Sequence, residues 1–153
     1  MRRMASSTTT RGVAATVGVG PKLGRSITRE SEGRKAQVFV IRIDCSDSKS
    51  ISEAFDGFLS LEFVEVLVYN AYYQPVFWNL ISFTDIKIDS FEKSLVVSFL
   101  GAFLCAQQVL PGMVKRRRGM ILFTGRSTSL CGIAGFSELC CEKFVLRALP
   151  KCL

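Results

Sequence analysis

The chain has 153 residues, of which 48% are hydrophobic and 22% are charged, and this composition is typical of one folded domain. Its formal net charge is +7, but no aromatic residues interleave with its basic clusters, so no nucleic-acid partner is expected. The absence of histidine excludes triads with a histidine base and histidine-containing zinc sites. The six cysteines form no CxxC pair, which favours reduced thiols in a cytoplasmic protein.

The first eleven residues, MRRMASSTTTR, are basic, rich in hydroxyl groups and free of acids. They predict a flexible tail over 1–11, followed by one domain over 12–153. The tail leaves organellar targeting as a weaker alternative to the cytoplasmic location.

Strands and helices alternate along this domain. The predicted strands are 12–20, 36–44, 64–72 and 119–126, and the predicted helices are 21–32, 51–61, 89–113 and 136–149. We expect the third helix to end at Pro111 and Gly112. Its most apolar stretch, 95–106, is too short to span a bilayer, so no membrane partner is expected. The alternation predicts an α/β fold with a mostly parallel sheet of about four strands and helices on both faces, three layers in all.

A glycine-rich turn follows the first predicted strand. Gly18, Gly20 and Gly24 form a GxGxxxG pattern between this strand and the next predicted helix. Glycine permits positive φ and lets a pyrophosphate approach the N-terminus of the helix, where free N–H groups point outward. The turn therefore indicates a dinucleotide site at the carboxyl ends of the strands.

Five segments, in order, resemble the short-chain dehydrogenase/reductase family: GVGPKLGRSI, DCSD, YNAY, SFLGAFLCAQQVLPGM and FTGRSTSLCGIAGFSELCCEKFVLRAL. The resemblance implies an incomplete Rossmann-like domain that binds NAD or NADP and transfers a hydride between the nicotinamide and a carbonyl or alcohol. It assigns the cofactor to Gly18, Gly20, Leu23, Gly24, Asp44, Asn70, Ala71 and Lys143. It assigns catalysis to Ser127 and Lys143.

Two positions depart from the family's catalytic pattern. Leu139 stands where the family has its proton-donating tyrosine, four residues before Lys143, and Ser98 stands where it has a helix asparagine. A leucine side chain neither gives nor takes a proton, so catalysis is expected to be impaired. The alternative is a non-catalytic nucleotide-binding or dimerising module, or a fragment without a function of its own. A homodimer through helix 94–110 is the expected protein partner.

The pattern is abridged after the glycine turn. About thirty residues of the family's usual βαβ spacing are absent between Arg29 and Ala36. By motif, 36–44 is the family's third strand, but so short a crossover can return it beside the first strand. Asp44 would then meet the ribose hydroxyl of the cofactor. The family's pattern also continues for two strands past Leu153, which leaves 119–126 as an expected exposed edge.

Overall fold

A computed structural model describes residues 13–18, 38–39, 43–60, 63–73 and 80–153. Its strands are β1 (Val13–Val17), β2 (Val38–Phe39), β3 (Val64–Tyr69) and β4 (Met120–Phe123). Its longer helices are α2 (Ser48–Leu59), α3 (Ile88–Leu95), α4 (Gly101–Arg116) and α5 (Ser137–Ala148), with the π-helical turn η2 (Val96–Leu100) between α3 and α4. Single 3-10 turns are η1 (Phe83–Asp85), η3 (Ser127–Ser129) and η4 (Leu149–Lys151). The alternation of strands and helices confirms the predicted α/β class.

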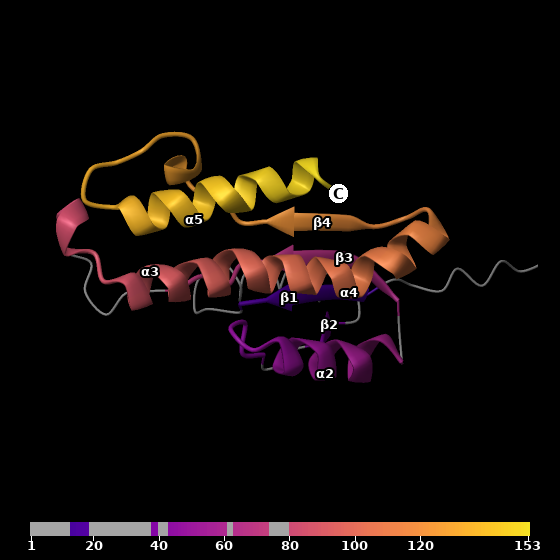
Figure 1. Ribbon diagram of the computed structural model, residues 1–153. Helices are drawn as coiled ribbons and strands as arrows, with labels where there is room; N and C mark the ends of the chain where they lie inside the picture. Colours follow the sequence, from indigo (N-terminus) through magenta and orange to yellow (C-terminus); the bar gives the residue numbers. More distant parts are fainter. Residues whose placement is uncertain (1–12, 19–37, 40–42, 61–62, 74–79) are drawn as a thin grey trace, which may run out of the picture.

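The four strands form one parallel sheet in the order β2-β1-β3-β4 (Figure 1). Ala14 of β1 pairs with Val38, so the strand predicted at 36–44 lies beside the first strand, as the short crossover predicted. Thr16 of β1 pairs with Val68 of β3, which continues the parallel register toward β4. All carboxyl ends therefore lie along the same edge of the sheet.

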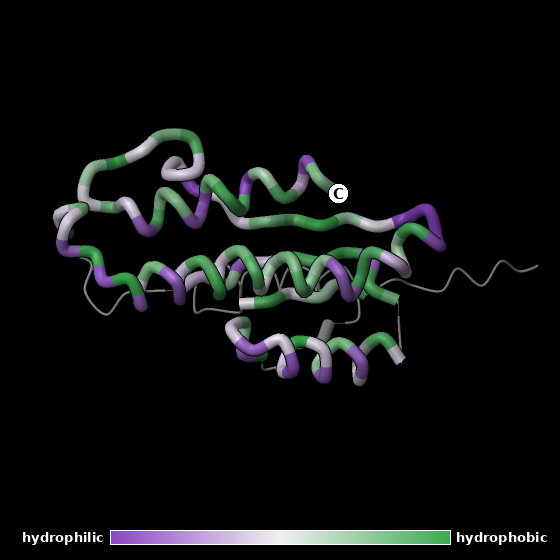
Figure 2. Tube along the Cα trace, in the orientation of Figure 1, coloured by the Kyte–Doolittle hydropathy of each residue, from purple (hydrophilic) through white to green (hydrophobic). Residues whose placement is uncertain are grey.

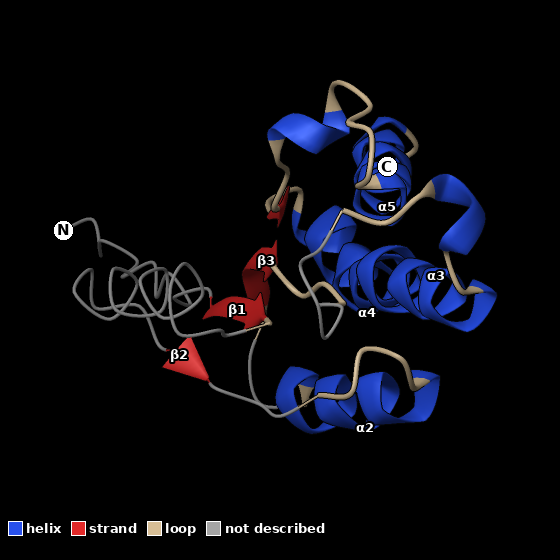
Figure 3. Ribbon diagram, turned by 90° about the vertical axis from the view of Figure 1, so that its left-hand side faces the viewer, coloured by secondary structure: helices blue, strands red, loops and turns tan. Residues whose placement is uncertain are grey.

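The described helices α2, α3, α4 and α5 all lie on one side of the sheet, as the view along the strands shows (Figure 3). The helix predicted at 21–32, which would supply the layer on the opposite side, lies outside the described residues. Within the described part, α4 packs against β3 and lies between α2 and α5. This layer of helices includes α5, which lies near the edge of the sheet where the strands have their carboxyl ends; we call this edge the carboxyl edge.

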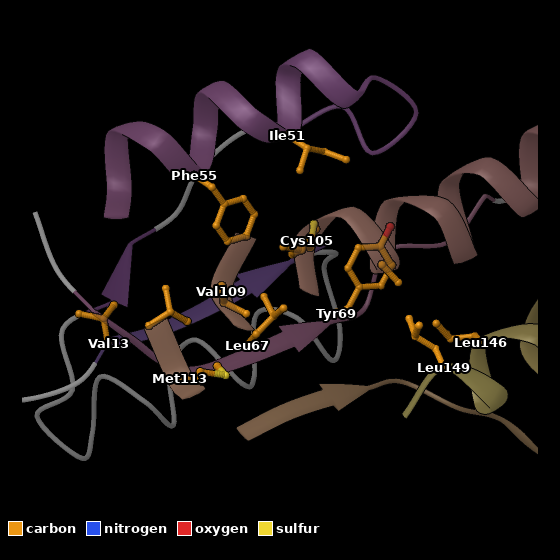
Figure 4. Packing of buried hydrophobic residues seen from close by; sticks show 13 residues of the cluster. Val13, Ile51, Phe55, Leu67, Tyr69, Cys105, Val109, Met113, Leu146 and Leu149 are labelled. Atoms are coloured by element: carbon orange, nitrogen blue, oxygen red, sulfur yellow. The ribbon is translucent and has the colours of Figure 1, made fainter. Parts of the chain in front are cut away.

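The core lies between this helical layer and the sheet (Figure 4). Ile51 and Phe55, one turn apart on α2, are 1% and 3% exposed, which is the apolar stripe of an amphipathic helix. The carboxylate of Asp47 accepts the backbone N–H groups of Lys49 and Ser50 at 3.0 and 3.2 Å and so caps α2. Because of this cap, α2 begins three residues before the predicted helix at 51–61.

The helix expected to stop at Pro111 continues to Arg116, so that prediction is wrong. It ends where Arg117 adopts a left-handed backbone with φ 53°. The N–H of Arg118 bonds to the carbonyl of Met113, and the N–H of Arg117 bonds to that of Val114, each at 3.1 Å. These bonds form a Schellman motif, and the buried side chain of Met113 anchors the turn that holds the proline.

The helical run from Ile88 to Arg116 is long and apolar enough to cross a membrane by length and composition alone. That test is also passed by core helices of soluble proteins. Here Ala102, Cys105, Ala106 and Val109 are at most 1% exposed. Since α4 contacts β3 and β4, it is the central helix of the layer.

Strand β4 forms one edge of the described sheet, as expected, and its stretch of the chain is coloured mostly as hydrophobic (Figure 2). Met120 and Leu122 are 54% and 46% exposed, whereas Ile121 and Phe123 turn toward the helices and are partly buried. A groove of about 610 Å³ lies beside this edge, between the C-terminal part of α4 and the residues Pro150 and Leu153 that follow α5.

Candidate functional site

The ends of β1 and β3 join tightly at Gly18. The backbone N–H of Asn70 donates to the carbonyl of Val17 at 2.9 Å, and the Asn70 side-chain amide donates to the carbonyl of Gly18 at 2.8 Å. Gly18 has φ +80°, and a Cβ atom there would overlap the backbone of Ala71. The structure thus brings together three of the residues predicted to hold the cofactor. Gly20, Leu23 and Gly24 lie outside the described residues.

Asp44 lies in the turn between β2 and α2, and its side chain is exposed. Its carboxylate accepts the hydroxyl of Ser46 at 2.6 Å and the N–H of Ser46 at 2.9 Å. These two hydrogen bonds lower the pKa of Asp44, the hydroxyl contributing most. Asp44 is therefore a carboxylate near neutral pH, and it does not line the hollow beside Lys143 described below.

Helix α5 carries Lys143 into the protein next to another charged residue. Lys143 and Glu142 are 4% and 1% exposed, and Lys143 Nζ lies 3.7 Å from Glu142 Oε1. The hydroxyl of Ser98 donates to Glu142 Oε2 at 2.7 Å. Burial lowers the pKa of Lys143 and raises the pKa of Glu142, and the attraction between the two opposes both shifts.

The π-helical turn η2 places Ser98 opposite α5. Within this turn, the phenol of Tyr69, at the end of β3, donates to the carbonyl of Val97. Burial raises the pKa of Tyr69, so the phenol stays protonated and can donate. Gly101 follows, and a Cβ atom there would collide with Tyr69 and with Cys45. The contact fixes α4 against β3 and leaves Ser98 fully buried, with its hydroxyl on Glu142.

A hollow of about 90 Å³ lies at the carboxyl ends of β3 and β4 and is lined by Asn70, Tyr72, Thr124, Arg126 and Lys143. The ring of Tyr72 lies over Lys143, with its centre 5.5 Å from Nζ. Arg126 is near enough that its charge contributes to the lowered pKa of Lys143. The hollow therefore joins Asn70 of the β1–β3 junction to Lys143 of α5.

The other predicted catalytic residue, Ser127, is exposed and begins η3, and it does not line this hollow. Arg126, one residue earlier, does. Leu139 lies one helical turn before Lys143 and is partly buried. The sequence reasoning missed Arg126, although residues two apart in an extended segment share a side, and Thr124 precedes it by two. It also missed Tyr72 and Glu142, whose sequence patterns gave no signal of their positions.

The residues present meet only part of what a nicotinamide dinucleotide needs. Lys143 and Asn70 offer polar groups at the carboxyl edge, where nucleotides bind in open parallel sheets. The hollow beside Lys143, however, has about 90 Å³, whereas pockets for whole ligands have roughly 300–1,000 Å³. A coenzyme would therefore lie along the edge and place only a small group next to Lys143.

Comparisons with known proteins give a consistent family. The family model described as short chain dehydrogenase matches residues 2–153. The mouse (Mus musculus) 3-ketodihydrosphingosine reductase is 31% identical over 71 residues, which are 46% of this chain and 21% of that protein. The mouse dehydrogenase/reductase SDR family member 7B is 27% identical over 133 residues, 86% of this chain and 40% of that protein.

Solved structures show the same fold. A short-chain dehydrogenase from Streptomyces avermitilis superposes with a TM-score of 0.83 at 19% identity. The match covers 92% of this chain and 58% of that one. This chain thus spans about a fifth to two fifths of the curated relatives named above and somewhat more than half of that structure.

Proposed function

The chain belongs to the short-chain dehydrogenase family, and we propose that its carboxyl edge binds NAD or NADP in an oxidoreductase with impaired catalysis. The observation that carries this proposal is the position of Lys143. Its buried ammonium opens into a hollow at the carboxyl edge that also contains Asn70, and Asn70 bonds to Gly18 at the end of β1. A glycine turn, an amide and a lysine along one edge are the parts that a nucleotide site of this family requires.

Each predicted residue has a role in this proposal. The cofactor is held by Gly18, Gly20, Leu23, Gly24, Asp44, Asn70, Ala71 and Lys143. Lys143 donates hydrogen bonds to hydroxyl groups of the coenzyme, and Ser127 polarises the substrate carbonyl after a rearrangement that turns it inward. The bound coenzyme supplies the hydride. Leu139 supplies no proton, which is why turnover is slow, and the proposed location is the cytoplasm.

A second candidate, a nucleotide-binding module without catalysis, is favoured by a specific observation. Both Arg126 and Ser127 are exposed, but Arg126 lines the hollow beside Lys143 and Ser127 does not. An arginine remains protonated at neutral pH and gives no proton to a substrate oxygen. With Leu139 one turn before Lys143, the described part of the hollow contains no obvious general acid other than Lys143 and Tyr72.

Titration of the purified chain with NADH and NADPH, followed by coenzyme fluorescence, tests the binding. We expect saturable binding that weakens in Asp44→Ala and is unchanged in Asp56→Ala, an exposed aspartate on α2 that serves as the matched control. Absence of binding to a folded wild-type chain contradicts the proposal. Equal affinity in Asp44→Ala and the wild type contradicts the role of Asp44 alone.

Turnover on a panel of aldehydes and ketones separates the two candidates. Slow oxidation of bound NADH supports the impaired oxidoreductase, and binding without oxidation supports the non-catalytic module. Leu139→Tyr restores a phenol one turn before Lys143 and should raise turnover if the remaining site is competent. If Leu139→Tyr binds NADH and still shows no turnover, the missing proton donor is not what limits catalysis.

The proposed protein partner is a second copy that packs on the helix predicted at 94–110. Leu100 and Phe103, on one side of this helix, are 45% and 38% exposed, and Phe144 of α5 is 43% exposed. Light scattering after size exclusion should show a dimer that Phe103→Lys disrupts. If Leu122→Lys on β4 disrupts the dimer instead, copies associate through the sheet edge.

A further inference from the structure

We propose that the hollow between Lys143 and Arg126 is a binding site for a small oxyanion, the phosphate or carboxylate group of a ligand. This inference specifies the charge of the ligand group that enters the hollow, and it goes beyond the binding of a nicotinamide coenzyme. It rests on the lining of the hollow, on the bonding of Lys143 and on the fixed backbone of Arg126.

The lining of the hollow is cationic. Its described lining includes two positive side chains, Arg126 and Lys143, and among these described residues there is no carboxylate. The others, Asn70, Tyr72 and Thr124, carry an amide and two hydroxyl groups. The volume of about 90 Å³ compares with a share of about 30 Å³ for one water molecule in the liquid, so a compact polyatomic group fits and an aromatic ring system does not.

Lys143 has hydrogen-bonding capacity to spare. An ammonium group has three N–H donors. Its ion-pair partner, Glu142 Oε1, lies 3.7 Å away, which is longer than the usual N–H···O bond. Glu142 Oε1 is buried without a hydrogen-bond partner among the described residues. A buried ammonium in this state gains from an anionic acceptor that reaches it through the hollow.

Glu142 does not cancel this attraction. Its carboxylate lies behind Lys143, held by the hydroxyl of Ser98, and it does not line the hollow. Arg126 adds a second positive side chain to the lining of the hollow. The ring of Tyr72 also lies over Lys143, with its centre 5.5 Å from Nζ.

Arg126 is held in place by its main chain. The carbonyl of Arg126 accepts the N–H of Ser129 at 2.9 Å and the hydroxyl of Ser129 at 2.6 Å. The carbonyl of Ser129 in turn accepts the side chain of Arg147 on α5 at 3.5 Å. The segment after β4 is therefore bonded to α5. This fixes the backbone of Arg126 relative to Lys143, and less motion has to be lost when a ligand binds between the two side chains.

Two sources of oxyanion have the same chemistry: a phosphate of the coenzyme and an acidic group of a substrate. Titration of the labelled chain with sodium phosphate and with sodium acetate, by NMR at constant ionic strength, measures the site without a coenzyme. We expect saturable shifts at Arg126, Lys143 and Asn70, and Arg126→Gln should weaken phosphate binding about tenfold or more. The matched control is Lys115→Gln, which removes one exposed positive charge at the end of α4 and should leave the affinity unchanged.

The outcomes separate this inference from the proposed function. Equal weakening in Lys115→Gln and Arg126→Gln, or shifts that do not saturate, shows attraction by net charge only and overturns the site. NADH binding without phosphate or acetate binding overturns the site and leaves the nucleotide proposal intact. Phosphate binding without NADH binding supports the site alone. Where both bind, competition by NADH assigns the oxyanion to the coenzyme, and simultaneous binding assigns it to a substrate.

Discussion

Two regions of the carboxyl edge use polar groups in opposite ways. At the β1–β3 junction, Asn70 saturates the carbonyls of Val17 and Gly18, and no space is left for a Cβ atom on Gly18. At the α5 end, Glu142 Oε1 is buried without a hydrogen-bond partner among the described residues, and Lys143 Nζ lies 3.7 Å from it, next to a hollow. Polar groups that are hydrogen-bonded to each other, as at the first region, indicate a structural requirement. A buried polar atom without a described hydrogen-bond partner next to a hollow, as at the second, indicates a place for a ligand.

The β1–β3 junction is the more sensitive to substitution. Gly18→Ala places a Cβ atom against the backbone of Ala71 at a residue with φ +80°. The left-handed backbone and the overlap together should lower the free energy of unfolding by about 2–5 kcal/mol, measured by urea denaturation. Gly57→Ala is the control, because nothing lies within 4 Å of its Cβ position on α2, and it should stabilise by roughly 0.5–1 kcal/mol. An equal response of both variants would show that Gly18 is not required by the junction.

The α5 end should respond as a coupled pair. Lys143→Met removes the counter-ion of buried Glu142, which must then stay charged without a partner or take up a proton, and this should cost on the order of 3 kcal/mol of unfolding free energy. The double variant Glu142→Leu with Lys143→Met removes both charges and should recover most of that loss. Urea denaturation of the single and double variants gives the coupling energy. If the losses simply add, the two side chains do not act as a pair.

The same pair makes stability depend on pH. Burial lowers the pKa of Lys143, so in alkaline solution the unfolded chain binds a proton that the folded chain has already released. The free energy of unfolding should therefore rise with pH between the lowered pKa and the ordinary pKa of lysine. Lys143→Met removes this component, and the difference between the two pH profiles isolates it. NMR titration of the Lys143 side chain provides a direct check, and a pKa at or above the ordinary value would contradict the prediction.

The sequence predicted what depends on local patterns. Short apolar runs located β1 and β3, and amphipathic spacing located α2 and α5. The short crossover predicted that the strand containing Val38 lies beside β1. Prediction from sequence failed at Pro111, because a capped helix end anchored by Met113 outweighs the local preference of one proline. The π-helical turn that aims Ser98 at Glu142 depends on Tyr69, nearly thirty residues earlier, and no local pattern reports such a contact.

The candidate site likewise contains residues that local sequence patterns predicted and residues that they did not. Gly18 and Asn70 were predictable because a tight turn and a strand end leave a mark on the sequence. Whether Arg126 or Ser127 faces Lys143 depends on the phase of an extended segment, in which a shift of one residue reverses the side of the sheet. The conformation of η3, fixed by the Ser129 hydrogen bonds to Arg126, sets that phase.

The smallest expected effects concern two aspartates in the turn before α2, one with a structural role and one with a proposed role in coenzyme binding. Asp47 caps α2 with two backbone hydrogen bonds, so Asp47→Ala should lower the free energy of unfolding by about 1 kcal/mol. Asp44 is exposed, and among the described residues its side chain bonds to Ser46 alone, so Asp44→Ala should cost about 0.5 kcal/mol or less. Coenzyme affinity should show the opposite pattern. Asp44→Ala should weaken coenzyme binding, whereas folded Asp47→Ala should bind the coenzyme as tightly as the wild type. Urea denaturation and NADH titration of both variants measure the two patterns, and a loss of affinity that tracks stability would show that Asp44 supports only the turn before α2.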